Sequence, residues 1–264
     1  MELLTLPDAP PIVFGELKVP GAKRTLMIYV HYDGQPVAYD QWESGSPWSG
    51  ELYTDAREKG GQKRSFPEAG EKIDPKWRIY GRSASDDKAP FPALLAVLDA
   101  FREAGIQPSS PNIGAYYETY KDKLSANAWI VLDGPVHQSG RPQIVYGVRG
   151  TAALDITVYG ALQHDKIALV HRRGGYPASR TPIDLPISET IIAAIKRIDD
   201  RGPVLVPTYG ASLPVFHFTR NSEVPLLIIP IANFDNNQHA PDENLRIGNL
   251  WFGIELYAAL FTMP

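Results

Sequence analysis

The sequence predicts an α/β protein, because short apolar runs typical of buried strands alternate with longer segments of helical periodicity. The length of 264 residues suffices for one substantial core, or for one large and one small domain. Strands, rich in β-branched or aromatic side chains, are expected at residues 12–17, 25–30, 128–132, 204–206 and 224–231. Helices are expected at residues 92–104, 115–124, 185–198 and 246–261.

The connecting segments differ in character. Residues 39–76 form a long irregular stretch rich in Gly, Ser, Trp and charge, of the kind that is usually functional or mobile in a compact domain. Regular structure is expected to resume at residues 77–82. Residues 143–160 are expected to form a long hairpin, and the basic residues at 171–175 a solvated turn.

Composition excludes several classes of protein. The net charge of −4 argues against a nucleic-acid partner, which would require a basic surface. The chain has no cysteine, so disulfides and thiolate metal sites are excluded. No apolar run has the length of a membrane span, and the N-terminus has no signal-peptide pattern, which predicts a cytoplasmic protein without a membrane partner.

Two expected strands end in metal-competent side chains. The apolar run at 25–30 leads into His31, and Asp33 lies on the same side of the chain, where its carboxylate can hold the imidazole ring. The strand at 128–132 leads into Asp133. In open α/β sheets, ligands bind outside the carboxyl ends of the strands. The alternative for His31 is a histidine that merely ends a strand.

Two further polar segments complete the candidate group. Asp86 and Asp87 precede the helix at 92–104, where they could belong to a site or cap the helix. His239 lies in a polar loop after the strand at 224–231, and Glu243 follows four residues later. His137 is interpreted as a surface residue or as one that supports a ligand.

Two histidines and two carboxylates, His31, Asp86, Asp133 and His239, suit zinc, or manganese or cobalt, in a hydrolase. A carboxylate shared between two ions is the device of a two-metal site. The small-residue loop at 210–214 has backbone N–H groups that could hold an anion.

Four motifs in this order resemble a known family. The motifs are HYDGQPV (31–37), IYGRSASDDK (79–88), DG (133–134) and NNQHAPDEN (236–244). They are similar to those of the di-zinc metallopeptidases that include carnosinases, cytosolic dipeptidases, aminoacylases, succinyl-diaminopimelate desuccinylase and glutamate carboxypeptidases, and most similar to the dipeptidase-like branch. The resemblance implies a single catalytic domain over residues 1–264, with a mixed central sheet flanked by helices.

The resemblance also implies a role for each candidate residue. His31 and Asp133 would bind one zinc ion, Asp86 would bridge two ions, and His239 would bind the second. Asp33 would orient His31.

The same resemblance implies a substrate site and a reaction. Gly210 and Ser212, in the loop at 210–214, would meet the terminal carboxylate of the substrate, with help from Arg180. The reaction would be amide hydrolysis of a dipeptide or an N-acyl amino acid. A water bridging the two metals would attack the carbonyl carbon, and a glutamate would take its proton.

The chain departs from the family pattern in two places. Near residues 107–110 the family has a glutamate pair that supplies the general base and a ligand of the second metal, and this chain contains no Glu-Glu sequence. Glu118, the nearest downstream acid, has no catalytic place in the family pattern. Near residues 161–175 the family inserts a lid domain through which it dimerises, and here the lid is expected to be largely absent.

These departures predict one intact metal position and impaired catalysis. The alternative is a non-catalytic remnant that binds a metal or an amino acid, or an inactive fragment.

Overall fold

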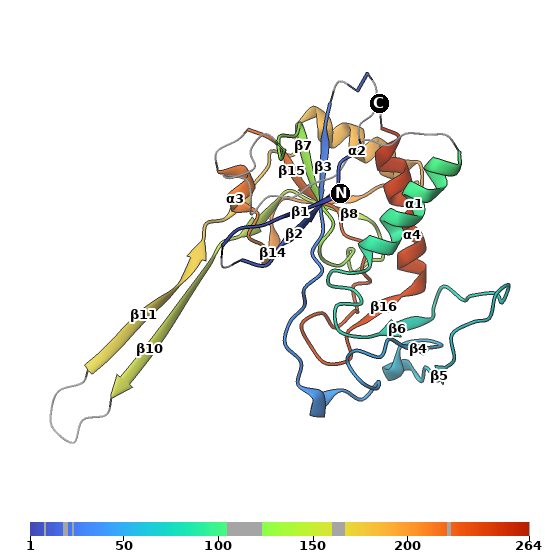
Figure 1. Cartoon of the computed structure of the whole chain (residues 1–264), viewed down its shortest axis with the longest axis horizontal. Coiled ribbons are helices and arrows are strands. Elements are labelled where there is room, and N and C mark those ends of the chain that lie inside the picture. Colours follow the sequence, from blue (N-terminus) through green and yellow to red (C-terminus); the bar gives the residue numbers. More distant parts are fainter. Residues whose placement is uncertain are drawn as a thin grey trace.

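The computed structural model describes residues 1–7, 9–17, 21–22, 24–104, 123–159, 167–220 and 223–263. A mixed five-stranded sheet forms its centre, with the strands in the order β13-β8-β15-β7-β3 (Figure 1). These strands are β3 (Leu26–Tyr29), β7 (Ala128–Val131), β8 (Gln143–Val145), β13 (Val204–Val206) and β15 (Leu226–Ile228). β3, β7 and β15 run parallel to one another, β13 runs parallel to β8, and β8 pairs with β15 in the antiparallel sense.

Helices cover one face of this sheet. They are α1 (Pro90–Glu103), α2 (Pro186–Lys196) and α4 (Ile247–Phe261). Alternate strand residues such as Ile28, Ile130 and Leu227 point into the core that these helices close. These helices therefore bury one face of the central sheet, and the predicted α/β class is confirmed.

The other face of the sheet carries a second core. Met27 and Trp129 point to this side, opposite to their neighbours in the strands. They pack with the antiparallel ribbon of β1 (Glu2–Leu4) and β2 (Ile12–Phe14) and with the short helix α3 (Phe216–Thr219). The strand expected at 12–17 thus exists in shortened form, outside the central sheet.

A second sheet corrects the expectation of an irregular stretch at 39–76. It has the order β16-β6-β4-β5 and lies beside the carboxyl edge of the central sheet (Figure 1). Its strands are β4 (Glu51–Tyr53), β5 (Lys63–Arg64), β6 (Arg78–Tyr80) and β16 (Asn244–Arg246), and two 3₁₀ turns, Tyr39–Gln41 and Arg57–Lys59, lie in the same stretch. These strands have two or three residues each, which is too short for a clear alternation in the sequence.

The long hairpin expected at 143–160 is wrong. β8 lies in the central sheet, and the next strand, β9 (Gly147–Arg149), lies in a separate sheet between β12 (Ser179–Arg180) and β14 (Tyr209–Ser212). β10 (Thr151–Tyr159) pairs with β11 (Ile167–Tyr176) in a ribbon that projects from the body of the protein (Figure 1). The turn expected at 171–175 is also wrong, because these residues lie within β11.

Two expectations cannot be compared with the structure. The break near 107–110 and nearly all of the helix expected at 115–124 lie outside the described residues. None of the helices in the described part of the chain is both long and apolar enough to span a bilayer.

Candidate metal centre

Two predicted ligands lie at the carboxyl ends of neighbouring parallel strands. His31 follows β3 and Asp133 follows β7, and these strands pair with Tyr29 opposite Val131. Because each ligand lies two residues beyond this pair, the strand register brings both to the same place on the sheet edge.

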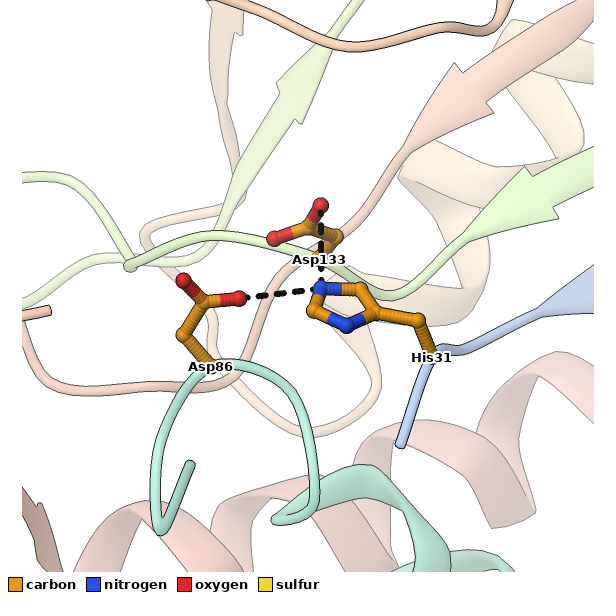
Figure 2. A group of neighbouring side chains, drawn as sticks. All are labelled: His31, Asp86 and Asp133. Atoms are coloured by element: carbon orange, nitrogen blue, oxygen red, sulfur yellow. Dashed lines mark ion pairs between the residues drawn. The ribbon is translucent and has the colours of Figure 1, made fainter. Parts of the chain in front are cut away.

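Asp86 completes the group and contacts both predicted histidine ligands. Its Oδ1 lies 3.0 Å from Nε2 of His31, and its Oδ2 lies 2.6 Å from Nε2 of His239. Oδ2 of Asp133 lies 3.8 Å from the same His31 nitrogen (Figure 2). The structure therefore brings together all four side chains that the sequence nominates as metal ligands.

The acids that precede α1 do not cap this helix. Ala89 occupies the capping position, and no side chain makes a capping hydrogen bond there. Asp86 instead faces the histidines, while Asp87 is buried and accepts a hydrogen bond at Oδ2 from the backbone N–H of His31, at 3.4 Å. The geometry supports the site interpretation over the capping alternative.

The ligand atoms have the spacing that one metal ion requires. Ligands about 2.1 Å from a tetrahedral zinc lie about 3.4 Å from one another, and the two separations measured from Nε2 of His31 are 3.0 and 3.8 Å. Nδ1 of His31 is hydrogen-bonded to Asp33, which leaves Nε2 for the metal. Three protein ligands with an open fourth position are typical of catalytic zinc, and manganese or cobalt also accepts this donor set.

A second metal position is incomplete in the part of the chain that the structure describes. There, His31, Asp86 and Asp133 are the only group of three potential ligands whose atoms lie within 4.8 Å of one another. His239 shares only Asp86 with this group.

Electrostatics at the site favour a bound cation. Burial alone would lower the pKa of His31, but the hydrogen bond to Asp86 and the charges of Asp133, Asp86 and Asp33 raise it to about 9. Burial and the charge of Asp86 raise the pKa of Asp133 to about 6. Burial, with the charges of Asp133 and Asp86, also raises the pKa of Asp87. A metal ion would offset this crowding of negative charge.

Replacing Asp33 with alanine is expected to weaken zinc binding by about tenfold, at the lower end of the usual effect of a residue that supports a ligand. Asp33 holds Nδ1 of His31 at 3.0 Å, but its side chain is 87% exposed, and its own backbone carbonyl lies within 3.3 Å of the same nitrogen. Competition with a chromophoric chelator measures the affinity. Asp40→Ala, in an exposed turn, is the matched control, and equal affinities for both variants would contradict the orienting role.

The ligands line a hollow of about 350 Å³. Ser212 also lines it, as do Tyr209 and Ala211, while Gly210 lies between these two in the chain. The loop expected at 210–214 is in part a strand, since Gly210 and Ser212 belong to β14. The pairing of β14 with β9 shifts register between Tyr209 and Ser212, as at a β-bulge.

Two other predicted residues lie elsewhere. Arg180 lines a separate hollow with Thr181 and Pro207 and is not among the residues that line the metal-site hollow. His137 is half-buried, lies 2.8 Å from Oγ of Ser139, and is likewise absent from that lining.

Several polar residues that line the hollow were not nominated from the sequence, among them Tyr29, Gln143 and Tyr209. Tyr29 lies two residues before His31 and points the same way, so its position could have been inferred from the strand period. Gln143 begins β8 and donates a hydrogen bond to the carbonyl of Pro135 at 2.7 Å, a contact that no local pattern indicates.

Comparison with known proteins gives consistent matches. The sequence profile described as "Peptidase family M20/M25/M40" matches residues 27–263. The Cys-Gly metallodipeptidase dug1 of Schizosaccharomyces pombe is 28% identical over 167 residues, covering 57% of this chain and 31% of that protein. The human β-Ala-His dipeptidase is 25% identical over 195 residues, covering 62% of this chain and 34% of that protein. The chain thus spans about a third of the length of the curated relatives it matches.

Solved structures show the same fold. A metallo-carboxypeptidase from Sulfolobus solfataricus superposes with a TM-score of 0.71 at 16% identity, covering 97% of this chain and 88% of the other. The dipeptidase Dug1p from Saccharomyces cerevisiae superposes with a TM-score of 0.68 at 13% identity, covering 98% and 84%. The mixed sheet with its helices is therefore the fold of these peptidase structures.

Proposed function

Because the chain belongs to the peptidase family M20/M25/M40, we propose that it is a metal-dependent hydrolase of the dipeptidase, carboxypeptidase or aminoacylase type. Its substrates would be dipeptides or N-acyl amino acids, cleaved at the amide bond. The observation that carries the proposal is the convergence of His31, Asp86 and Asp133 at one edge of the central sheet.

Each residue of the site has its own proposed role in hydrolysis. His31, Asp86 and Asp133 would hold the metal, which polarises a carbonyl and activates a water molecule. Asp33 keeps the tautomer of His31 that leaves Nε2 free for the metal. Ser212 and the bulged backbone at Gly210 would bind the terminal carboxylate of the substrate.

Catalysis is expected to be impaired. The chain lacks the glutamate pair on which the family pattern depends, and His239 with Asp86 supplies only two ligands for a second ion. Loss of a positioned general base typically costs a factor of about 100 to 10,000 in rate. This absence favours the alternative of a non-catalytic protein that binds a metal or an amino acid. The lid contacts expected to support a dimer are also proposed to be missing.

Metal analysis and an amidase assay on the purified chain test the proposal. The chain is stripped with a chelator and reloaded with zinc, manganese or cobalt, and bound metal is measured by mass spectrometry. The substrates, offered separately, are Cys-Gly, β-Ala-His and N-acetyl amino acids. The first two are chosen because two of the relatives are named for them. We expect one metal per chain and slow turnover that chelation abolishes.

The outcomes separate the two functions. One bound metal with turnover supports the hydrolase. One bound metal without turnover on any of these substrates supports the non-catalytic alternative. No bound metal contradicts both the hydrolase and the metal-binding form of the alternative.

A further inference from the structure

Glu243 is buried beside the loop that carries Asp86, with 1% of its side chain exposed. Its Oε1 accepts hydrogen bonds from the backbone N–H groups of Ser85 and Asp86, at 3.1 and 2.9 Å, and from the hydroxyl of Ser85 at 2.9 Å. Its Oε2 accepts from the N–H of Ser83 at 3.0 Å and from Nη1 of Arg82 at 2.8 Å. All five donors belong to the segment that leads to Asp86.

The pair of Glu243 and Arg82 is itself buried, with side-chain exposures of 1% and 3%. Burying two charges is costly, so a buried ion pair is weak evidence for stability. The guanidinium carbon of Arg82 lies 5.4 Å from the centre of the Trp42 ring, and the backbone N–H of Arg82 donates to the carbonyl of Pro47 at 2.7 Å.

Glu243 also shares its segment of chain with a candidate ligand. His239 lies four residues earlier and contacts the second carboxylate oxygen of Asp86. The segment is closed by a hydrogen bond from the N–H of Asn244 to the carbonyl of Asn236 at 2.8 Å, and the carbonyl of Glu243 accepts from the N–H of Gly81 at 2.9 Å. One short piece of chain therefore contacts the side chain of Asp86 and fixes its backbone.

We propose that Glu243 is a positioning residue that sets the place of Asp86 between His31 and His239 through the backbone of residues 83–86. The proposal rests on the metal-binding function proposed above. Both oxygens of Glu243 face only donors. A glutamine would turn its NH₂ group toward some of these donors, so the loop would have to shift and would displace the carboxylate of Asp86.

The test compares four variants with the wild-type chain in zinc affinity and in the visible absorption of the cobalt-loaded protein. Glu243→Gln replaces one of the two acceptor oxygens of Glu243 with an NH₂ donor, and Ser85→Ala removes a single hydroxyl donor. Glu255→Gln, on the exposed face of α4, is the chemical control. Ile195→Ala, on the buried face of α2, is the stability control, since it weakens the fold away from the site. All measurements are made below the unfolding transition of the least stable variant.

Glu243→Gln is expected to lower zinc affinity about 10- to 100-fold and to change the cobalt spectrum. Ser85→Ala is expected to produce a smaller change in the same direction, and it tests the proposal even where Glu243→Gln does not fold. Ile195→Ala is expected to lower the melting temperature without altering affinity or spectrum. Wild-type affinity and spectrum in both Glu243→Gln and Ser85→Ala, or an equal loss in Ile195→Ala, would overturn the positioning role alone. A wild-type chain that binds no metal would overturn the metal-binding function and, with it, this inference.

Discussion

Asp86→Asn is expected to lower the affinity for zinc by more than about 100-fold, which exceeds the range usual for residues that only support a ligand. Asp86 presents one oxygen to His31 and the other to His239, so it is the residue that both histidines share. An asparagine keeps the size but has one neutral oxygen, while its NH₂ group cannot bind a metal.

Titration against a chromophoric chelator measures this change. Asp184→Asn, an exposed acid in the turn before α2, is the matched control and should retain wild-type affinity. Zinc binding by the Asp86 variant as tight as that of the wild type would contradict the role of Asp86 as a metal ligand. Circular dichroism of both variants should remain that of the wild type, because the substitution changes no volume in the core.

Trp129→Ala is expected to lower the free energy of unfolding by about 3–5 kcal/mol, the usual cost of removing a large aromatic side chain from a core. Trp129 lies in β7 with 1% of its surface exposed, and its ring stacks on Phe218 of α3 with 4.8 Å between centroids and 6° between planes. This loss of stability has two parts: the favourable transfer free energy of the buried indole is lost, and a cavity is left between the sheet and α3.

Chemical denaturation monitored by circular dichroism measures this stability. Trp251→Ala is the control, because this tryptophan lies on α4 with 39% of its surface exposed, and its loss should cost much less. A loss of stability in Trp129→Ala as small as that expected in Trp251→Ala would show that the second core, between the sheet and α3, contributes little to stability. Trp129→Ala should bind zinc more weakly only when it is partly unfolded, because unfolding of β7 would displace Asp133 at the end of this strand.

The sequence alone predicts the elements whose patterns are strong and local. The runs that become β3 and β7 are continuous and apolar, and the apolar faces of α1 and α2 are long enough to display the helical period. The place of His31 and Asp133 at the ends of parallel strands follows from the same patterns, because strand ends meet at one edge of a sheet.

Short strands and pairings between distant segments are harder to predict from the sequence. β4, β5 and β6 have at most three residues each, and β16, the partner of β6, comes from near the end of the chain. Residues 143–160 suggest a hairpin locally, but β8 and β9 belong to two different sheets, and β10 pairs with β11. Pairing partners depend on the whole chain, so no local window contains them.

The places of His31, Asp86, Asp133 and His239 at the ends of expected strands and helices, together with the four motifs, thus nominated the side chains of the candidate metal centre from the sequence alone. Only the tertiary structure decided how they are held. It showed that Asp86 faces both histidines instead of capping α1, that Arg180 lies at a different hollow, and that Glu243 fixes the loop before α1. The physical reason is that a hydrogen bond between residues 157 positions apart, such as that from Asp86 to Glu243, depends on packing and leaves no periodic signal in the chain.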